Sequence, residues 1–249
     1  MPLRIGCDLD GVLANMDAEL LRQSEAVFGE AFARELQEST ESPPGDAESA
    51  ETVASSASDP PSESIPPPAT LQMTSRQQQR LWRHVATIEN FWEGLTELEP
   101  GVIARLASIA TERRWEIIFL TRRPETAGAT AQVQTQRWLE SKGFPLPSVF
   151  VVQGSRGRIA AALHLDIVID DRPENCLDVV VDSKARAILI WREDPGRLPA
   201  AARRLGIGVV NSVAECLDIL TRIDGPDKDE PGVMARVRKL LGLRESTGT

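Results

Sequence analysis

Aromatic residues are scarce in this sequence, and tyrosine is absent. They make up 4% of the 249 residues, as five Trp and six Phe. A pocket that recognises a ligand by ring stacking therefore has few candidate side chains. These candidates are Phe28, Phe32, Trp82, Phe91 and Trp92. For Trp92, which is near a predicted turn, packing is the commoner role of such a ring.

Cysteine is also rare, with Cys7, Cys176 and Cys216 far apart in the sequence. This spacing excludes the closely spaced ligands of a zinc site and the density of a disulfide scaffold. Cys7 and Cys216 are in apolar surroundings, where a reduced cysteine acts as a small hydrophobic residue. The sequence therefore favours a reducing compartment, and we expect a cytoplasmic protein.

Long apolar runs are missing as well. Residues 1–5 lead directly into a predicted strand, without the apolar region of a secretory signal. No apolar segment approaches the length that crosses a membrane. We therefore expect no membrane partner.

The net charge of −9 is concentrated in one part of the chain. Residues 38–70 contain seven acidic residues and neither Lys nor Arg, so the rest of the chain carries only about −2. The region from 39 to 70 is also rich in Ser, Pro and Ala, which predicts a disordered insert. A nearly neutral remainder has no basic footprint for nucleic acid, so no nucleic-acid partner is expected.

Predicted strands and helices alternate through most of the chain. An amphipathic helix is predicted for 17–37, a second begins at Ser75, and a third is predicted for about 125–142. The predicted strands are 3–9, 115–120, 148–152, 165–169, 185–191 and 207–210. Repeated strand-then-helix units favour a parallel sheet with helices on both faces, which makes this an α/β protein.

Polar residues follow three of these strands directly. Asp8 and Asp10 follow the first, Thr121 the second, and Asp170 and Asp171 the fourth. Ligands of parallel sheets bind beyond the carboxyl ends of the strands. Four carboxylates that converge there need a shared cation, and an oxygen-only donor set favours Mg²⁺. Because Mg²⁺ neutralises phosphoryl oxygens, this pattern favours a phosphorylated substrate.

The segments around these acids resemble the haloacid-dehalogenase-like (HAD) superfamily. Residues 8–15 (DLDGVLAN) are similar to its first motif, 119–124 (FLTRRP) to its second and 168–175 (VIDDRPEN) to its acidic fourth. Three motifs in the same order are far more specific than one. Together with residues 91–95 (FWEGL), they look most like the 5′-nucleotidase and deoxyribonucleotidase branch.

The resemblance implies a role for each of the five residues. Asp8 would attack phosphorus and form an aspartyl-phosphate, while Asp10 would protonate the leaving oxygen and then activate water. Asp8, the backbone carbonyl of Asp10, and Asp170 would bind Mg²⁺, with Asp171 binding it through water or orienting its shell. Thr121 would hydrogen-bond the phosphoryl oxygens.

One position departs from the family pattern. The third motif normally supplies a Lys, and alignment by distance to the acidic pair puts Arg156 there, with Arg158 as the second choice. Arg keeps the charge and binds phosphate through two N–H groups, but it is wider and planar. Arg122 is a further candidate for phosphate binding. Arg122 and Arg123 are both equally explained as solvated charges or as a contact to the substrate.

The resemblance also implies a division of the chain. Residues 1–15 and 96–224 would form a Rossmann-like three-layer sandwich, and 16–95 a small helical cap inserted after the first strand. Residues 225–249 would add a linker and an amphipathic helix over 233–243.

Three functions follow as hypotheses. The first is an Mg²⁺-dependent phosphatase for a small phosphomonoester, with nucleotides among the candidates. The second is a weak or inactive relative that serves as a binding module, and the third an enzyme acting on a phosphorylated macromolecule. The sequence leaves the oligomeric state open.

Overall fold

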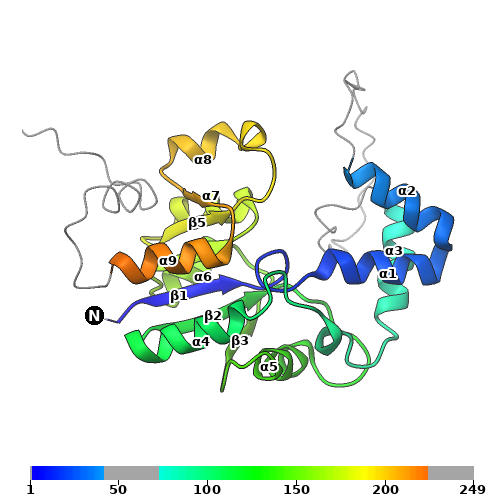
Figure 1. Cartoon of the computed structure of the whole chain (residues 1–249), viewed down its shortest axis with the longest axis horizontal. Coiled ribbons are helices and arrows are strands. Elements are labelled where there is room, and N and C mark those ends of the chain that lie inside the picture. Colours follow the sequence, from blue (N-terminus) through cyan, green and yellow to red (C-terminus); the bar gives the residue numbers. More distant parts are fainter. Residues whose placement is uncertain (1, 42–72, 224–249) are drawn as a thin grey trace, which may run out of the picture.

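Six parallel strands form one sheet in the computed structural model, which describes residues 2–41 and 73–223 (Figure 1). The order across the sheet is β3-β2-β1-β4-β5-β6. The strands are β1 (Arg4–Asp8), β2 (Glu116–Thr121), β3 (Ser148–Val151), β4 (Ile167–Asp170), β5 (Arg186–Ile190) and β6 (Gly208–Val210). Each is within about two residues of its predicted bounds, because short buried apolar runs mark the strands clearly.

Helices cover both faces of this sheet, since alternate residues of each strand point to opposite sides. On β2, Ile117 and Phe119 pack in one apolar cluster, while Ile118 and Leu120 pack in the other. The first cluster includes residues of α4 (Val102–Arg113), α5 (Ala131–Ser141) and α9 (Val213–Ile223). The second includes residues of α6 (Arg156–Ala162), α7 (Pro173–Asp182) and α8 (Ala200–Arg204). The predicted α/β three-layer sandwich is confirmed.

The strand order places β1 and β4 at the centre of the sheet. The chain adds strands outward from β1 on one side, through β2 and β3, and returns to start β4 on the other side. This reversal is the topological switch point, where a crevice opens at the carboxyl ends of the strands. The register pairs Cys7 with Ile169, so the next residues, Asp8 and Asp170, end adjacent strands.

Three further helices stand beside the carboxyl end of β1 (Figure 1). They are α1 (Met16–Phe28), α2 (Glu30–Glu41) and α3 (Ser75–Val85), and the 3₁₀ helix η1 (Phe91–Gly94) follows α3. The prediction of one helix over 17–37 was wrong, because Gly29 ends α1 with a φ of 92° that breaks the helical path.

The helix predicted for 125–142 begins later, at Ala131. Thr130 caps it by accepting a hydrogen bond from the Val133 amide at 3.3 Å. The preceding residues bond to the segment after α3 instead, since the Ala127 amide donates to the Ala86 carbonyl and its own carbonyl accepts from the Asn90 amide. Tertiary hydrogen bonds thus replace helical ones over 125–129.

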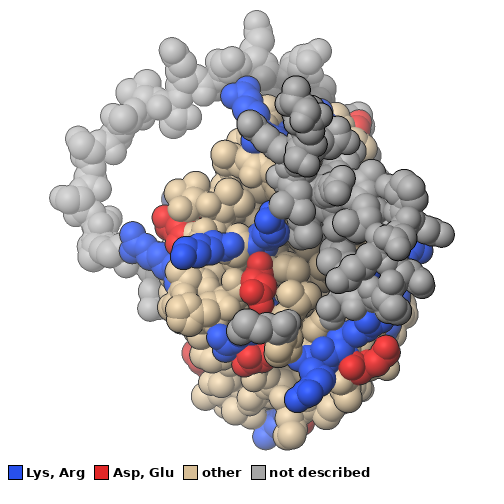
Figure 2. Space-filling view, turned by 90° about the vertical axis from the view of Figure 1, so that its left-hand side faces the viewer, with Lys and Arg blue, Asp and Glu red and all other residues tan. Residues whose placement is uncertain are grey.

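Some predictions concern residues outside the described ranges. These are residues 42–70 of the predicted disordered insert and the helix predicted for 233–243. The prediction was wrong for residues 39–41, which form the last turn of α2. Among the residues described, no helix combines the length and apolar character that a membrane span requires. At the end of the molecule where β1 begins, both basic and acidic side chains stand among uncharged ones (Figure 2).

Candidate active site

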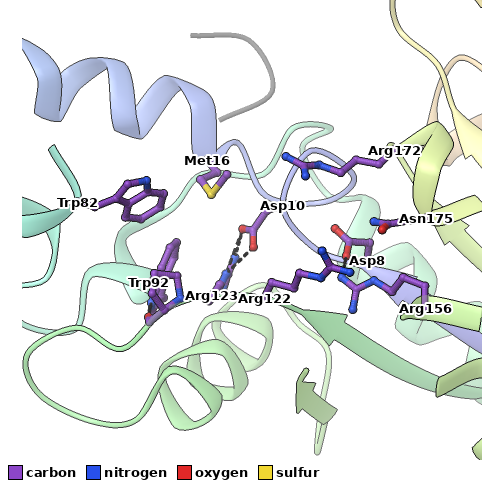
Figure 3. A pocket seen from close by; sticks show the side chains of 11 residues that line it. Asp8, Asp10, Met16, Trp82, Trp92, Arg122, Arg123, Arg156, Arg172 and Asn175 are labelled. Atoms are coloured by element: carbon purple, nitrogen blue, oxygen red, sulfur yellow. Dashed lines mark hydrogen bonds and ion pairs between the residues drawn. The ribbon is translucent and has the colours of Figure 1, made fainter. Parts of the chain in front are cut away.

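Asp8 and Asp170 form a buried pair of carboxyl groups at the switch point. Only 6% of Asp8 and none of Asp170 is exposed. The guanidinium of Arg156 bridges them: Nη2 donates to Asp8 Oδ1, and Nε lies 3.5 Å from Asp170 Oδ2. The residues predicted from the ends of β1 and β4 and from the start of α6 therefore meet. Figure 3 shows Arg156 reaching toward Asp8.

Arg156 is oriented inward by the packing of α6 on α7. Gly157 allows this close approach, because a Cβ there would collide with the Asp178 carbonyl. Arg156 is 2% exposed, and its Nε and Nη1 lack a hydrogen-bond partner. The other candidate, Arg158, is 84% exposed and lies 4.0 Å from Asp182. Of the two arginines, Arg156 is the one that contacts Asp8.

Asp10 is held by two residues from the end of β2. Thr121 Oγ1 donates to Asp10 Oδ2 at 3.0 Å, and the Arg123 guanidinium bonds both carboxylate oxygens. A threonine hydroxyl has one proton to donate, and here Asp10 receives it. Thr121 thus contacts the residue predicted to be the acid, whereas its predicted contact with phosphate stays a prediction.

Arg123 is the residue that sequence reasoning missed. It was given no more weight than a solvated charge, yet it is buried and paired with Asp10. One signal was available: residues two apart in an extended chain share a side, so Arg123 follows Thr121 toward the site. Arg122 also lines the cavity; its Nη2 donates to the Gly154 carbonyl at 3.2 Å, and its buried Nε lacks a partner.

Asp170 is fixed by the first turn of α7. Its carboxylate accepts hydrogen bonds from the Arg172 amide at 2.9 Å and from Asn175 Nδ2 at 3.0 Å. Asn175 is part of the acidic motif but was not assigned a role from the sequence. Because α7 begins directly after β4, this short connection orients Asp170 toward Asp8.

Burial raises the pKa of three carboxyl groups of the site. Burial raises the pKa of Asp8 well above its ordinary value, and the neighbouring Asp170 raises it further. Burial also raises the pKa of Asp170. Burial, followed by repulsion from Asp170, raises the pKa of Asp171 to about 7. Burial therefore disfavours the charged form of these three carboxyl groups.

These residues fit a magnesium ion. No three His, Cys, Asp or Glu side chains in 2–41 or 73–223 form a metal site by themselves. Mg²⁺ does not need such a cage, since it keeps several waters and binds through one or two carboxylates. Asp8 and Asp170 supply two, the Asp10 carbonyl would add a third oxygen, and Asp171 would bind through water. Burial disfavours the charge of Asp8 and Asp170, and a bound cation would offset this penalty.

The raised pKa values predict how stability depends on pH without metal. A folded protein whose carboxyl pKa is raised binds the proton more tightly than the unfolded chain, so stability falls as pH rises. For Asp171 the window runs from about 4 to about 7. In EDTA, we expect this window to show a loss of roughly 1 kcal/mol per pH unit from Asp171. Thermal unfolding should give a shallower pH slope for Asp171→Asn than for wild type; equal slopes would contradict the assignment.

The loop after β1 is held by its own backbone and by Arg192. The Leu9 carbonyl accepts hydrogen bonds from the Leu13 and Ala14 amides, both at 2.8 Å. Arg192 donates to the Gly11 carbonyl at 2.6 Å and to Glu99 at 2.7 Å. Glu99 also accepts from the first amides of α9, those of Val213 and Ala214. This network fixes the loop that carries Asp10.

Gly11 provides a sharp test of this loop. Its φ is +87°, and a Cβ there would collide with the Asp171 carboxylate. We expect Gly11→Ala to weaken Mg²⁺ binding about tenfold, because Asp171 must move. The measurement is a Mg²⁺ titration followed by thermal unfolding.

Gly29→Ala is the matched control for Gly11→Ala. Its φ is +92°, but nothing lies within 4 Å of an added Cβ. Both variants should therefore lose about 1–3 kcal/mol to backbone strain. Equal Mg²⁺ affinities in the two variants would contradict the role of Asp171.

A cavity of about 50 Å³ opens over Asp8. Figure 3 shows Arg122 and Arg156 extending toward Asp8, and Met16 beside Asp10. The other lining residues are Asp10, Trp82, Trp92, Arg123, Pro124, Arg172 and Asn175. The cavity thus has a charged floor and a wall of apolar side chains, and its size suits a phosphoryl group.

Two of the five candidate rings, Trp82 and Trp92, line this cavity. Trp92 is fully buried and serves as a packing anchor, with Arg123 4.9 Å and Trp82 6.3 Å from its ring. Phe91 packs edge-on against Trp92, and Phe28 packs against Phe32, each pair 4.8 Å apart. A wider cleft of about 610 Å³ lies on the other side of Met16 and Arg172.

Comparison with known proteins gives structural neighbours. A scan against family models finds no match, and a search of curated proteins finds none either. A HAD family hydrolase from Deinococcus radiodurans with bound phosphate and sodium is 15% identical and has a TM-score of 0.47. The match covers 89% of this chain and 96% of that one.

Two other solved structures are similar. A protein described as a β-phosphoglucomutase from Thermotoga maritima is 15% identical, with a TM-score of 0.48 and coverage of 89% of this chain and 99% of that one. A hydrolase from Pseudomonas syringae is 16% identical, with a TM-score of 0.47 and coverage of 90% and 99%. These likenesses are too distant to assign a function, which is proposed below from the geometry of the site.

Proposed function

We propose that the chain is a magnesium-dependent phosphatase of the HAD superfamily that hydrolyses a small phosphomonoester through an aspartyl-phosphate on Asp8. The observation that carries this proposal is the buried pair of Asp8 and Asp170 at the switch point, bridged by Arg156. The unpartnered Nε and Nη1 of Arg156 are suited to bind phosphoryl oxygens beside the nucleophile.

The first half of the reaction transfers the phosphoryl group. Asp8 attacks phosphorus, a P–O bond to the carboxylate forms, and the bond to the leaving oxygen breaks. Asp10 supplies the proton that this oxygen takes up as it leaves. Arg122 and Arg156 hold the phosphoryl oxygens while the apolar wall at Met16 and Trp82 excludes water.

The second half releases phosphate. Asp10, now ionised, takes a proton from water, which attacks phosphorus and breaks the bond to Asp8. Bound Mg²⁺ would neutralise phosphoryl oxygens and so let a carboxylate approach them. Asp8 and Asp170 would hold it together with the Asp10 carbonyl.

The proposed substrate is small. The cavity over Asp8 accommodates little more than a phosphoryl group, whereas pockets that bind drug-sized ligands have volumes of about 300 Å³ or more. The candidate rings pack against protein groups, so their arrangement does not favour nucleobase stacking. Cys7, Cys176 and Cys216 are buried free thiols, which supports the proposal of a reducing, cytoplasmic environment.

The deciding experiment is a phosphatase screen with and without Mg²⁺. The panel compares small sugar, acid and alcohol phosphates with nucleoside monophosphates. We expect Mg²⁺-dependent turnover of small phosphomonoesters, abolished by EDTA, and acid quenching should trap a phosphorylated protein. Turnover that is independent of Mg²⁺ would contradict the proposed metal. Nucleotides as the best substrates would contradict the proposed small substrate. A folded protein without turnover would favour a binding module.

A further inference from the structure

Arg123 makes an unusually complete contact with Asp10. Its Nη2 lies 2.7 Å from Asp10 Oδ1, and its Nε lies 3.0 Å from both carboxylate oxygens. The Arg123 side chain is fully buried, while 14% of the Asp10 side chain remains exposed. One partner is thus embedded in the protein, and the other reaches the cavity.

Rigid elements hold Arg123 in turn. Its Nη1 donates to Thr135 Oγ1 on α5 at 3.0 Å. Its guanidinium lies over two indole rings, 4.9 Å from Trp92 and 5.4 Å from Trp138. Both rings are fixed by their own hydrogen bonds, since Trp92 Nε1 donates to the Pro124 carbonyl and Trp138 Nε1 to the Leu95 carbonyl. The guanidinium therefore has little freedom to move.

This arrangement is costly if its purpose is only stability. A buried ion pair is often no more stabilising than apolar residues of similar volume, because both charges lose their hydration. The β2 end, η1 and α5 nevertheless converge on one charged group. What the arrangement supplies beyond stability is a fixed position for the Asp10 carboxyl.

We propose that Arg123 is a positioning residue that holds Asp10 where it meets the leaving group, with Trp92 and Trp138 keeping the guanidinium in place. This inference rests on the proposed function, in which Asp10 is the acid. Protonation of a leaving oxygen requires the acid within hydrogen-bond reach, so a displaced Asp10 impairs the leaving-group step. It does not impair phosphate binding, which falls to Arg122 and Arg156.

Two substrates separate this role from a merely structural one. p-Nitrophenyl phosphate releases a stable phenolate that needs little protonation, whereas glycerol phosphate releases an alkoxide that needs it. The parameter kcat/KM reports steps up to departure of the leaving group. For Arg123→Gln, we expect the kcat/KM ratio of aryl to alkyl phosphate to rise about 10²-fold. Arg123→Lys should bring this ratio part of the way back to the wild-type value.

The matched control is Arg137→Gln on α5, a 55% exposed arginine paired with Glu93. It should leave both values of kcat/KM unchanged. If Arg123→Gln lowers kcat/KM equally for both substrates, Arg123 has only a structural role and the inference is overturned.

A double-mutant cycle tests the contact independently of activity. Thermal midpoints are measured for wild type, Asp10→Asn, Arg123→Gln and the double variant. If Arg123 holds Asp10, the double variant loses less than the sum of the two single losses. Additive losses overturn the inference. If wild type hydrolyses neither substrate, the proposed function fails, and coupling in the cycle still decides whether Arg123 fixes Asp10.

Discussion

Replacement of Asp8 by Asn is expected to abolish turnover. An amide oxygen is a poor nucleophile, so the loss in kcat should reach about 10⁴-fold or more. The same change should leave the protein folded, because the amide still accepts a hydrogen bond from Arg156. Without metal it should even unfold at a higher temperature, since burial and repulsion from Asp170 both raise the pKa of Asp8 and so disfavour its charge.

The measurement combines steady-state kinetics with thermal unfolding in EDTA. Asp218→Asn serves as the matched control: this 53% exposed aspartate on α9 pairs with Arg105. It should change kcat by less than about twofold, as expected for a surface substitution. Turnover by Asp8→Asn within tenfold of wild type would rule out Asp8 as the nucleophile.

Replacement of Arg156 by Ala is expected to have the second large effect. It leaves the carboxylates of Asp8 and Asp170 buried side by side without their shared cation. Removing one member of a buried ion pair costs about 3–5 kcal/mol, so the metal-free protein should be strongly destabilised. Turnover should fall about 10²–10³-fold, because donors to the phosphoryl oxygens are lost.

Two companions make the Arg156 result specific. Arg156→Lys keeps the charge and should retain more activity than Arg156→Ala, although a point charge replaces a planar fork. Arg158→Ala removes an exposed arginine two residues away and should behave like wild type. If Arg156→Ala and Arg158→Ala have the same stability and kinetics, Arg156 has no role in the site.

The fold and the central acids could be predicted because their signals are local. A short apolar run followed by Asp-x-Asp-Gly marks both the end of β1 and the position of Asp8. A short apolar run followed by an acidic pair likewise marks the end of β4 and the position of Asp170. Their meeting follows from topology, since adjacent parallel strands end at one edge of a sheet. Arg156 was found through its spacing from the acidic pair.

Contacts between distant segments could not be predicted in this way. Arg123 became a buried partner of Asp10 because Trp92 and Trp138, from η1 and α5, enclose it. The loop over 125–129 escaped the helical prediction for a similar reason, as its amides bond to residues after α3. In each case the deciding partner is remote in sequence, so local periodicity carries no information about it.

Thr121 illustrates a subtler limit. Its place at the end of β2 was predicted, but the partner of its hydroxyl was not. The strand determines the position of Thr121, whereas the partner of its hydroxyl proton depends on which acceptor atom is nearest. Here that acceptor is Asp10, at 3.0 Å.

Glu99 joins parts of the molecule that are far apart in the chain. Its carboxylate accepts hydrogen bonds from the first two amides of α9 and from Arg192. Arg192 also donates to the carbonyls of Gly11 and Val12. Local opening of α9 would therefore release the loop beside the nucleophile. The two segments should behave as a single cooperative unit in native-state hydrogen exchange, with similar opening free energies. The lifetime of the assembled site then depends in part on α9, which follows the edge strand β6.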